Sequence, residues 1–215
     1  HVFRSDGKGR YRDATDAWWP ASQNVGEDDN MVAFLDFDSD GDADFVIGSL
    51  SGPDRLLIND GKGRLTLALD AFEGEPTPGT LGLALADLDG DHRMDVVQGQ
   101  GEHKTAIDGR VFSGRGLAPD TAAPSVSLVT AGQVGDARVG RARVHDRKSP
   151  SLPTEWAKVA VEWTTPGGVR EAPMRWYGEY LWRADRPAGV DATAPYRVCA
   201  TDAAGNTACA APGAR

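Results

Sequence analysis

An acidic stretch, FLDFDSDGDADFVIGS, occupies residues 34–49 and holds five aspartates within nine residues. Two carboxylates about 5 Å apart in water repel each other by roughly 0.8 kcal/mol, so several that converge on one point favour a bound cation. The spacing is DxDxDGxxD, with its carboxylates at Asp36, Asp38, Asp40 and Asp44. Those at positions one, three and five can turn inward, and the ninth can close the site. Such an oxygen-only cage suits calcium better than zinc or copper.

The same spacing returns 51 residues later in LADLDGDHRMDVVQGQG, which begins at Leu85. Its four carboxylates are Asp87, Asp89, Asp91 and Asp95. Position six is His92 instead of glycine; this position often needs a positive φ, which histidine tolerates better than most non-glycine residues. An EF-hand would need glutamate at position twelve, where the two loops have Ile47 and Gln98. The remaining alternative for both stretches is a solvated acidic turn without metal.

Strand-like segments flank both acidic loops and belong to a repeating unit. VAFLDFD enters the first loop and FVIGSL leaves it. The turns SDGKGR and NDGKGR, and a fainter copy SGRG, place their second glycines at Gly9, Gly63 and Gly116, at intervals of 54 and 53 residues. Two markers with nearly one period indicate a repeat of strand, acidic loop, strand, turn and strand. That is the size of one four-stranded propeller blade.

These residues resemble the calcium-binding loops of VCBS and FG-GAP repeats, the blade units of bacterial surface proteins and integrin α-subunit propellers. The resemblance covers Val2 to about Leu117 and rests on the acidic loops, the strands FVIGS and VVQGQG, and the turn LLINDGKGRL. It implies a calcium ion in each loop, with the backbone carbonyls of Asp42 and Arg93 as additional ligands. About two repeats and the end of another cannot close a propeller, so we expect a partner chain or an upstream segment to complete it.

The composition changes at APDTAAP, residues 118–124, which reads as a linker between domains 1–117 and 118–215. About seven short alternating runs follow, a pattern typical of an immunoglobulin-like β-sandwich. DTAAPSVSLV and YRVCATDAAGN resemble bacterial immunoglobulin-like modules of secreted proteins. We therefore predict an all-β chain of partial β-propeller-type repeats followed by such a sandwich.

Two cysteines, Cys199 and Cys209, flank the segment ATDAAGNTA. If Asp202 faces Asn206 across a turn at residues 203–205, the cysteines lie opposite each other in a hairpin. A cross-strand disulfide is then feasible and would fit an oxidising compartment. The alternative is a pair of free buried thiols.

Composition and motifs exclude several classes of function. The net charge of −9 and the lack of a basic run argue against nucleic acid as a partner. No apolar window reaches the 18 or so residues of a membrane-spanning helix, so we expect no membrane insertion. GxSxG, HExxH, P-loop and GxGxxG motifs are absent from the sequence. Trp18 and Trp19, before a proline in an expected loop, are candidates for contact with a ligand.

The sequence thus predicts a non-catalytic, calcium-binding module that is secreted or displayed on a bacterial cell surface. Its expected role is adhesion or the recognition of a protein or glycan ligand. The alternative is an accessory C-terminal region of a larger secreted enzyme whose catalytic domain lies upstream or on another chain. Because the chain begins with His1 instead of Met, we expect a processed or trimmed product.

Overall fold

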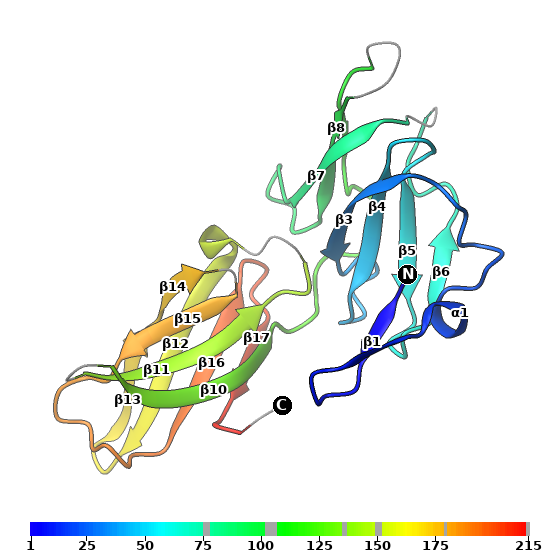
Figure 1. Ribbon diagram of the computed structural model, residues 1–215. Helices are drawn as coiled ribbons and strands as arrows, with labels where there is room; N and C mark the ends of the chain where they lie inside the picture. The colour runs from blue at the N-terminus through cyan, green and yellow to red at the C-terminus, as the bar shows by residue number, and fades with distance from the viewer. Residues whose placement is uncertain (75–77, 102–106, 135–136, 149–151, 179, 214–215) are drawn as a thin grey trace. The chain divides into compact units, whose positions relative to one another are not determined.

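The computed structural model describes residues 1–74, 78–101, 107–134, 137–148, 152–178 and 180–213 (Figure 1). Within these ranges the chain is nearly all strand, with one short helix, α1 (Thr15–Trp18), and one 3-10 helix, η1 (Pro153–Glu155). The all-β fold class is therefore confirmed. None of the described helices is long and apolar enough to cross a membrane. The chain forms two compact units, His1–Pro119 and Asp120–Arg215.

The described residues of the first unit form three antiparallel sheets, each of which runs in chain order. The hairpin at the N-terminus consists of β1 (Phe3–Ser5) and β2 (Tyr11–Asp13). The four-stranded sheet consists of β3 (Asp29–Leu35), β4 (Asp44–Ser49), β5 (Arg55–Asn59) and β6 (Leu65–Ala68). The three-stranded sheet consists of β7 (Thr80–Ala86), β8 (Asp95–Gln100) and β9 (Arg110–Phe112). Short meanders of this kind are typical of propeller-type blades.

The sheets repeat each other in register as well as in sequence. Leu35 pairs with Asp44 at the acidic loop of the first blade, and Ala86 pairs with Asp95 at that of the second. The hairpin β1–β2 corresponds in the same way to β5–β6. In both hairpins one aspartate, Asp6 or Asp60, accepts hydrogen bonds from the backbone N–H groups two and four residues later. The N-terminal hairpin thus matches the last two strands of the four-stranded sheet.

Both faces of the four-stranded sheet carry an apolar cluster, because side chains alternate between faces along each strand. One face contributes Leu35, Val46 and Leu56, which pack against Leu85 and Val96 of the next blade. The other face contributes a second apolar cluster of Ile47, Leu57 and Leu65, which is completed by Trp19 from the segment after α1. Blade packing thus fixes the strand ends from which the acidic loops project.

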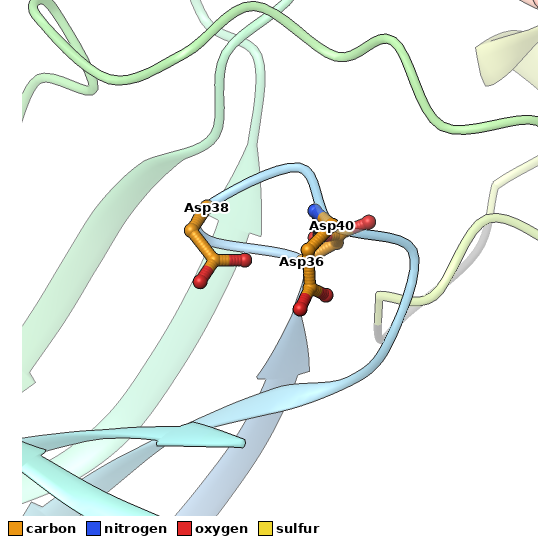
Figure 2. Close-up of side chains that lie close together, drawn as sticks. All are labelled: Asp36, Asp38 and Asp40. Atoms are coloured by element: carbon orange, nitrogen blue, oxygen red, sulfur yellow. Dashed lines mark hydrogen bonds between the residues drawn. The ribbon is translucent and has the colours of Figure 1, made fainter. Parts of the chain in front are cut away.

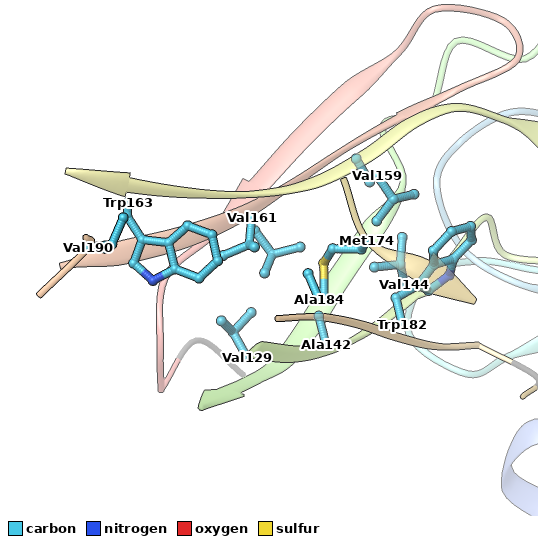
Figure 3. Close-up of a cluster of buried hydrophobic side chains, with 12 residues drawn as sticks. Val129, Ala142, Val144, Val159, Val161, Trp163, Met174, Trp182, Ala184 and Val190 are labelled. Carbon is cyan, nitrogen blue, oxygen red and sulfur yellow. The ribbon is translucent and has the colours of Figure 1, made fainter. Parts of the chain in front are cut away.

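In the part of the second unit that the structure describes, two four-stranded antiparallel sheets form a sandwich. One sheet has the order β10 (Ser125–Val134), β11 (Ala137–His145), β15 (Leu181–Asp185) and β14 (Arg175–Gly178). The other has the order β13 (Gly168–Pro173), β12 (Trp156–Thr165), β16 (Tyr196–Asp202) and β17 (Thr207–Ala210). A single apolar core fills the space between them, with Val144, Val161, Trp163 and Trp182 among its members (Figure 3).

Cys199 and Cys209 lie opposite each other on β16 and β17 and form a disulfide. The backbone N–H of Asp202 donates to the carbonyl of Asn206 at 3.1 Å, so the turn lies at residues 203–205, as the spacing predicts. The feasible cross-strand disulfide is therefore the one that forms, and the alternative of two free thiols is wrong.

Candidate metal sites in the acidic loops

The first acidic loop, residues 36–43 between β3 and β4, folds around the carboxylate of Asp36. Its two oxygens accept hydrogen bonds from the backbone N–H groups of Asp40 and Gly41, each at 3.0 Å. The backbone turns back through left-handed conformations at Ser39 and Gly41, with φ of 59° and 93°. Asp40 in turn accepts a hydrogen bond from the N–H of Asp42 at 3.0 Å. These short-range bonds set the curvature of the loop.

This curvature brings three carboxylates together, as Figure 2 shows. One oxygen each from Asp36, Asp38 and Asp40 lies within 4.8 Å of the others. No ion pair joins Asp38 or Asp40 to a cationic side chain of the described residues. Carboxylate oxygens have lone pairs to spare after accepting one hydrogen bond. The group is an oxygen-only donor set, and such sets fit calcium.

Asp44, the ninth residue of the pattern, lies outside this group of three and bridges the loop to its surroundings. Its side chain is 1% exposed. Its two oxygens accept hydrogen bonds from the backbone N–H groups of Phe37, at 2.7 Å, and Asn59, at 2.8 Å. Burial raises the pKa of Asp44 to about 7, although these two donors oppose the rise. Asp44 therefore anchors the loop to the turn after β5.

The second acidic loop, residues 87–94 between β7 and β8, repeats this scheme. Asp87 accepts hydrogen bonds from the backbone N–H groups of Asp91 and His92 at 3.1 and 3.0 Å. His92 adopts a φ of 62°, so histidine does take the left-handed conformation at position six. Asp95 is 3% exposed and accepts from the N–H groups of Leu88, at 2.8 Å, and Gly114, at 2.7 Å.

The two loops differ in how their carboxylates are neutralised. In the second loop the three that converge within 4.8 Å are Asp87, Asp89 and Asp95, so Asp91 is left out. Asp91 forms an ion pair with Arg93 at 3.1 Å, and Asp89 forms one with Arg115, also at 3.1 Å. Arginine thus supplies in the second loop part of the positive charge that the first loop lacks. A cation at the second loop would compete with Arg115.

The resemblance implies a backbone carbonyl ligand at position seven of each loop, from Asp42 and from Arg93. Both carboxylate oxygens of Asp42 are buried. A Cβ atom added to Gly61 would lie 3.1 Å from Asp42 Oδ2, so the two residues are close together. The Asp42 side chain therefore points toward the turn between β5 and β6. Burial, followed by the charges of Asp40 and Asp38, raises the pKa of Asp42. The Arg93 side chain donates to the carbonyl of Leu117 at 2.6 Å.

The tryptophans expected to contact a ligand are packed within the first unit. Trp19 is 6% exposed and belongs to the apolar cluster with Leu57 and Leu65. Trp18 is half-buried, and the guanidinium carbon of Arg4 lies 5.8 Å from its ring centroid. This burial argues against a ligand contact for Trp19. The acidic loops are thus the stronger candidate site.

Residues 36–97 match the family model described as an FG-GAP-like repeat. The match begins at the first residue of the first acidic loop and ends within β8, so it includes both loops, the strand after the first and the start of the strand after the second. It supports the FG-GAP part of the resemblance and agrees with the propeller-type blades. No curated protein matches the chain.

Proposed function

We propose that this chain is a non-catalytic, calcium-binding module of the extracellular space or a bacterial cell surface, which serves adhesion or the recognition of a protein or glycan ligand. The observation that carries the proposal is that two acidic loops, 51 residues apart, share one hydrogen-bonding scheme around a cluster of carboxylates. Without a cation the clustered charges repel each other; with one, they become ligands.

The first calcium ion would be held by the carboxylates of Asp36, Asp38 and Asp40, and the second by those of Asp87, Asp89 and Asp95. The backbone carbonyls of Asp42 and Arg93 would add to these sets. Calcium would order the loops, and the ordered loops would present a fixed surface at the end of each blade. Extracellular calcium is in the millimolar range that such modules need, and the Cys199–Cys209 disulfide fits an oxidising compartment.

A strand pair of the same repeat type is the second partner that we propose. Phe34 and Leu85 occupy equivalent positions in consecutive blades, yet Phe34 is 40% exposed and Leu85 is 3% exposed. Leu85 is covered by the preceding blade, whereas Phe34 lines an open groove of about 510 Å³ together with Val2, Val32 and Phe45. The first two strands of the incomplete blade would fill this groove and pair with the open edge of β1.

The second unit is, in this proposal, an immunoglobulin-like sandwich. Its strand orders, β10-β11-β15-β14 and β13-β12-β16-β17, correspond to the ABED and CFG sheets of immunoglobulin domains with one strand added beside C. The inter-sheet cysteine pair of antibody domains has no counterpart, because Cys199 and Cys209 bridge neighbouring strands of one sheet. The unit would act as a spacer or a second recognition surface.

The test is a calcium titration of the full chain with Asp38→Asn, Asp89→Asn and the double variant. Bound calcium is measured by equilibrium dialysis and the melting temperature is followed in parallel. A ligand at 100 times its dissociation constant stabilises the folded state by about 2.7 kcal/mol. We expect each single variant to lose one bound ion and part of this gain. Asp16→Asn, a change at an exposed aspartate of α1, is the matched control.

The proposal fails if wild-type protein binds no calcium up to about 10 mM, well above the range of extracellular modules. It also fails if the loop variants bind as much calcium as the control. Recognition is then tested on glycan and extracellular-protein arrays with calcium or with chelator. Binding that needs calcium and is lost in the double variant is the expected result.

A further inference from the structure

A third group of carboxylates lies in the second unit, away from the acidic loops. Asp120 precedes β10, Asp146 directly follows β11, and Asp202 ends β16. One oxygen from each lies within 4.8 Å of the others. The spacing of residues along the sequence does not predict this group, because its members are separated by 26 and 56 residues. The sandwich fold alone brings them together.

Asp146 is the member of this group whose negative charge has no hydrogen-bond or ion-pair partner among the described residues. Only 9% of its surface is exposed, and its carboxylate makes no hydrogen bond or ion pair with any residue in the described ranges. The neighbouring cations have other partners. The Nζ atom of Lys148 lies 3.3 Å from Glu155, and the guanidinium of Arg147 donates to the carbonyl of Ala123. A buried carboxylate without a partner is strongly unfavourable.

The other two carboxylates accept hydrogen bonds from nearby amide groups. Asp202, 1% exposed, accepts hydrogen bonds from the backbone N–H and the side-chain amide of Asn206 at 2.8 and 3.1 Å. The same amide donates to the backbone carbonyl of Asp120 at 3.2 Å, and Asp120 Oδ1 accepts from the N–H of Ala122 at 3.1 Å. Asn206 therefore ties Asp120 to Asp202, while Asp146 approaches both from the residue after β11.

We propose that Asp120, Asp146 and Asp202 bind a calcium ion that is distinct from the ions of the acidic loops. Three carboxylates without imidazole or thiolate form a hard, oxygen-only donor set. Calcium accepts irregular sets completed by water and backbone carbonyls, whereas magnesium demands a near-ideal octahedron. The ion would neutralise the carboxylate of Asp146, which has no hydrogen-bond or ion-pair partner among the described residues. It would also tie the entry to β10 to the ends of β11 and β16.

The experiment measures calcium binding by the full chain when both loops are disabled. In the Asp38→Asn, Asp89→Asn background, equilibrium dialysis against calcium chloride should find one remaining equivalent. Adding Asp146→Asn should remove it. Asp185→Asn is the matched control, because it changes the net charge equally. Asp185 is an exposed carboxylate at the end of β15, and it pairs with Val139 near the start of β11, whereas Asp146 follows the end of β11. Retention of the equivalent after Asp146→Asn would overturn the proposal.

A second measurement uses the protein without any change to the cluster. In ¹⁵N spectra of the loop-disabled chain, the backbone amide of Ala122 and the side-chain amide of Asn206 should shift as calcium is added. The same concentration of magnesium should shift them less. If these signals stay constant up to about 10 mM calcium, the cluster binds no calcium, whatever the loops do. If they shift while the loop variants bind as much calcium as wild type, the loop proposal fails and this one stands.

Asp146→Asn also has an effect that an ordinary structural carboxylate would not produce. In chelator the variant should melt at a higher temperature than its parent, because it removes a buried charge that has no partner. In calcium the order should reverse, because only the parent gains from the bound ion. A variant that is less stable than its parent in both buffers would mean that Asp146 serves packing and not metal binding.

Discussion

Asp44 accepts a hydrogen bond from the backbone N–H of Asn59, 2.8 Å away, and so joins the acidic loop to the turn that follows β5. Asp95 makes the equivalent bond with Gly114 at 2.7 Å in the next blade. The last carboxylate of each pattern therefore connects two consecutive hairpins of a blade. Its removal should affect the fold even in the absence of metal.

Asp44→Ala should destabilise the protein in chelator, because it leaves the N–H groups of Phe37 and Asn59 without acceptors. Each unsatisfied buried donor costs about 1–3 kcal/mol, so we expect a loss of about 2–4 kcal/mol in urea unfolding. Asp38→Ala, which removes no hydrogen bond among the described residues, should not destabilise the protein in chelator and should lower its stability only when calcium is present. Equal losses for the two variants in chelator would contradict the anchoring role of Asp44.

Arg115→Gln should raise the calcium affinity of the second loop. The guanidinium lies 3.1 Å from Asp89 and occupies a carboxylate that we assign to the metal. An exposed ion pair is weak, so the gain should be about two- to fivefold. Calorimetric titration of an Asp38→Asn, Asp146→Asn background isolates this loop from the other two proposed sites. Arg64→Gln, an exposed charge in the other blade, is the control, and an equal gain there would point to net charge alone.

Phe34→Ala and Leu85→Ala should differ in cost although the residues occupy equivalent positions. Leu85 is buried between blades, and truncation of a buried leucine costs about 2–5 kcal/mol. Phe34 is already 40% exposed and mainly loses its edge-to-face contact with Phe45, so about 1 kcal/mol is expected. Urea unfolding of both variants gives the comparison. A cost for Phe34→Ala as large as that for Leu85→Ala would show that the groove is already covered in solution.

Reduction of the Cys199–Cys209 disulfide should lower stability by about 2.7 kcal/mol, the loop-closure entropy of a crosslink of this size in the unfolded chain. The paired substitution to serine should reproduce the loss. Because both cysteines lie in the second unit, calcium binding by loops 36–44 and 87–95 should be unchanged. Differential scanning calorimetry with and without reductant measures the effect. Loss of calcium binding by these two loops on reduction would contradict this expectation.

Asp54 should make the stability of the first unit depend on pH. Burial raises its pKa above the ordinary value of 3.8, although Ser49, Thr80 and Gln98 donate hydrogen bonds to it. Its folded form therefore holds a proton more tightly than its unfolded form. The stability that this adds is complete below pH 3.8 and is lost as pH rises through the raised pKa.

Asp54→Asn has no such titration, so its free energy of unfolding relative to wild type should rise between pH 4 and pH 7. The amide can also donate to Gln98 Oε1, which is buried without a hydrogen-bond partner among the described residues. Urea unfolding at both pH values gives the difference, in which the titration of all other groups largely cancels. A difference that is constant or falls with pH would mean that the pKa of Asp54 is not raised.

The acidic loops and the disulfide hairpin could be read from the sequence because their geometry is local. Asp36 bonds to N–H groups four and five residues away, and His92 takes its left-handed φ within the same short turn. The Cys199–Cys209 bridge closes a turn of a few residues. Contacts over such distances follow from residue order and backbone sterics, so spacing alone determines them. Period-two alternation likewise predicted strands and the all-β class.

Only the tertiary structure decided which of these residues meet partners from elsewhere in the chain. The sequence made Trp19 a candidate for ligand contact in a loop, but packing of the segment after α1 against β4 and β5 buries it. The hydrogen bond between Asp44 and Asn59 and the ion pair between Asp89 and Arg115 form only because neighbouring hairpins align in one blade. The group of Asp120, Asp146 and Asp202 exists only where three strand ends of the sandwich converge. Such contacts depend on how whole sheets stack, which the spacing of residues along the chain does not specify.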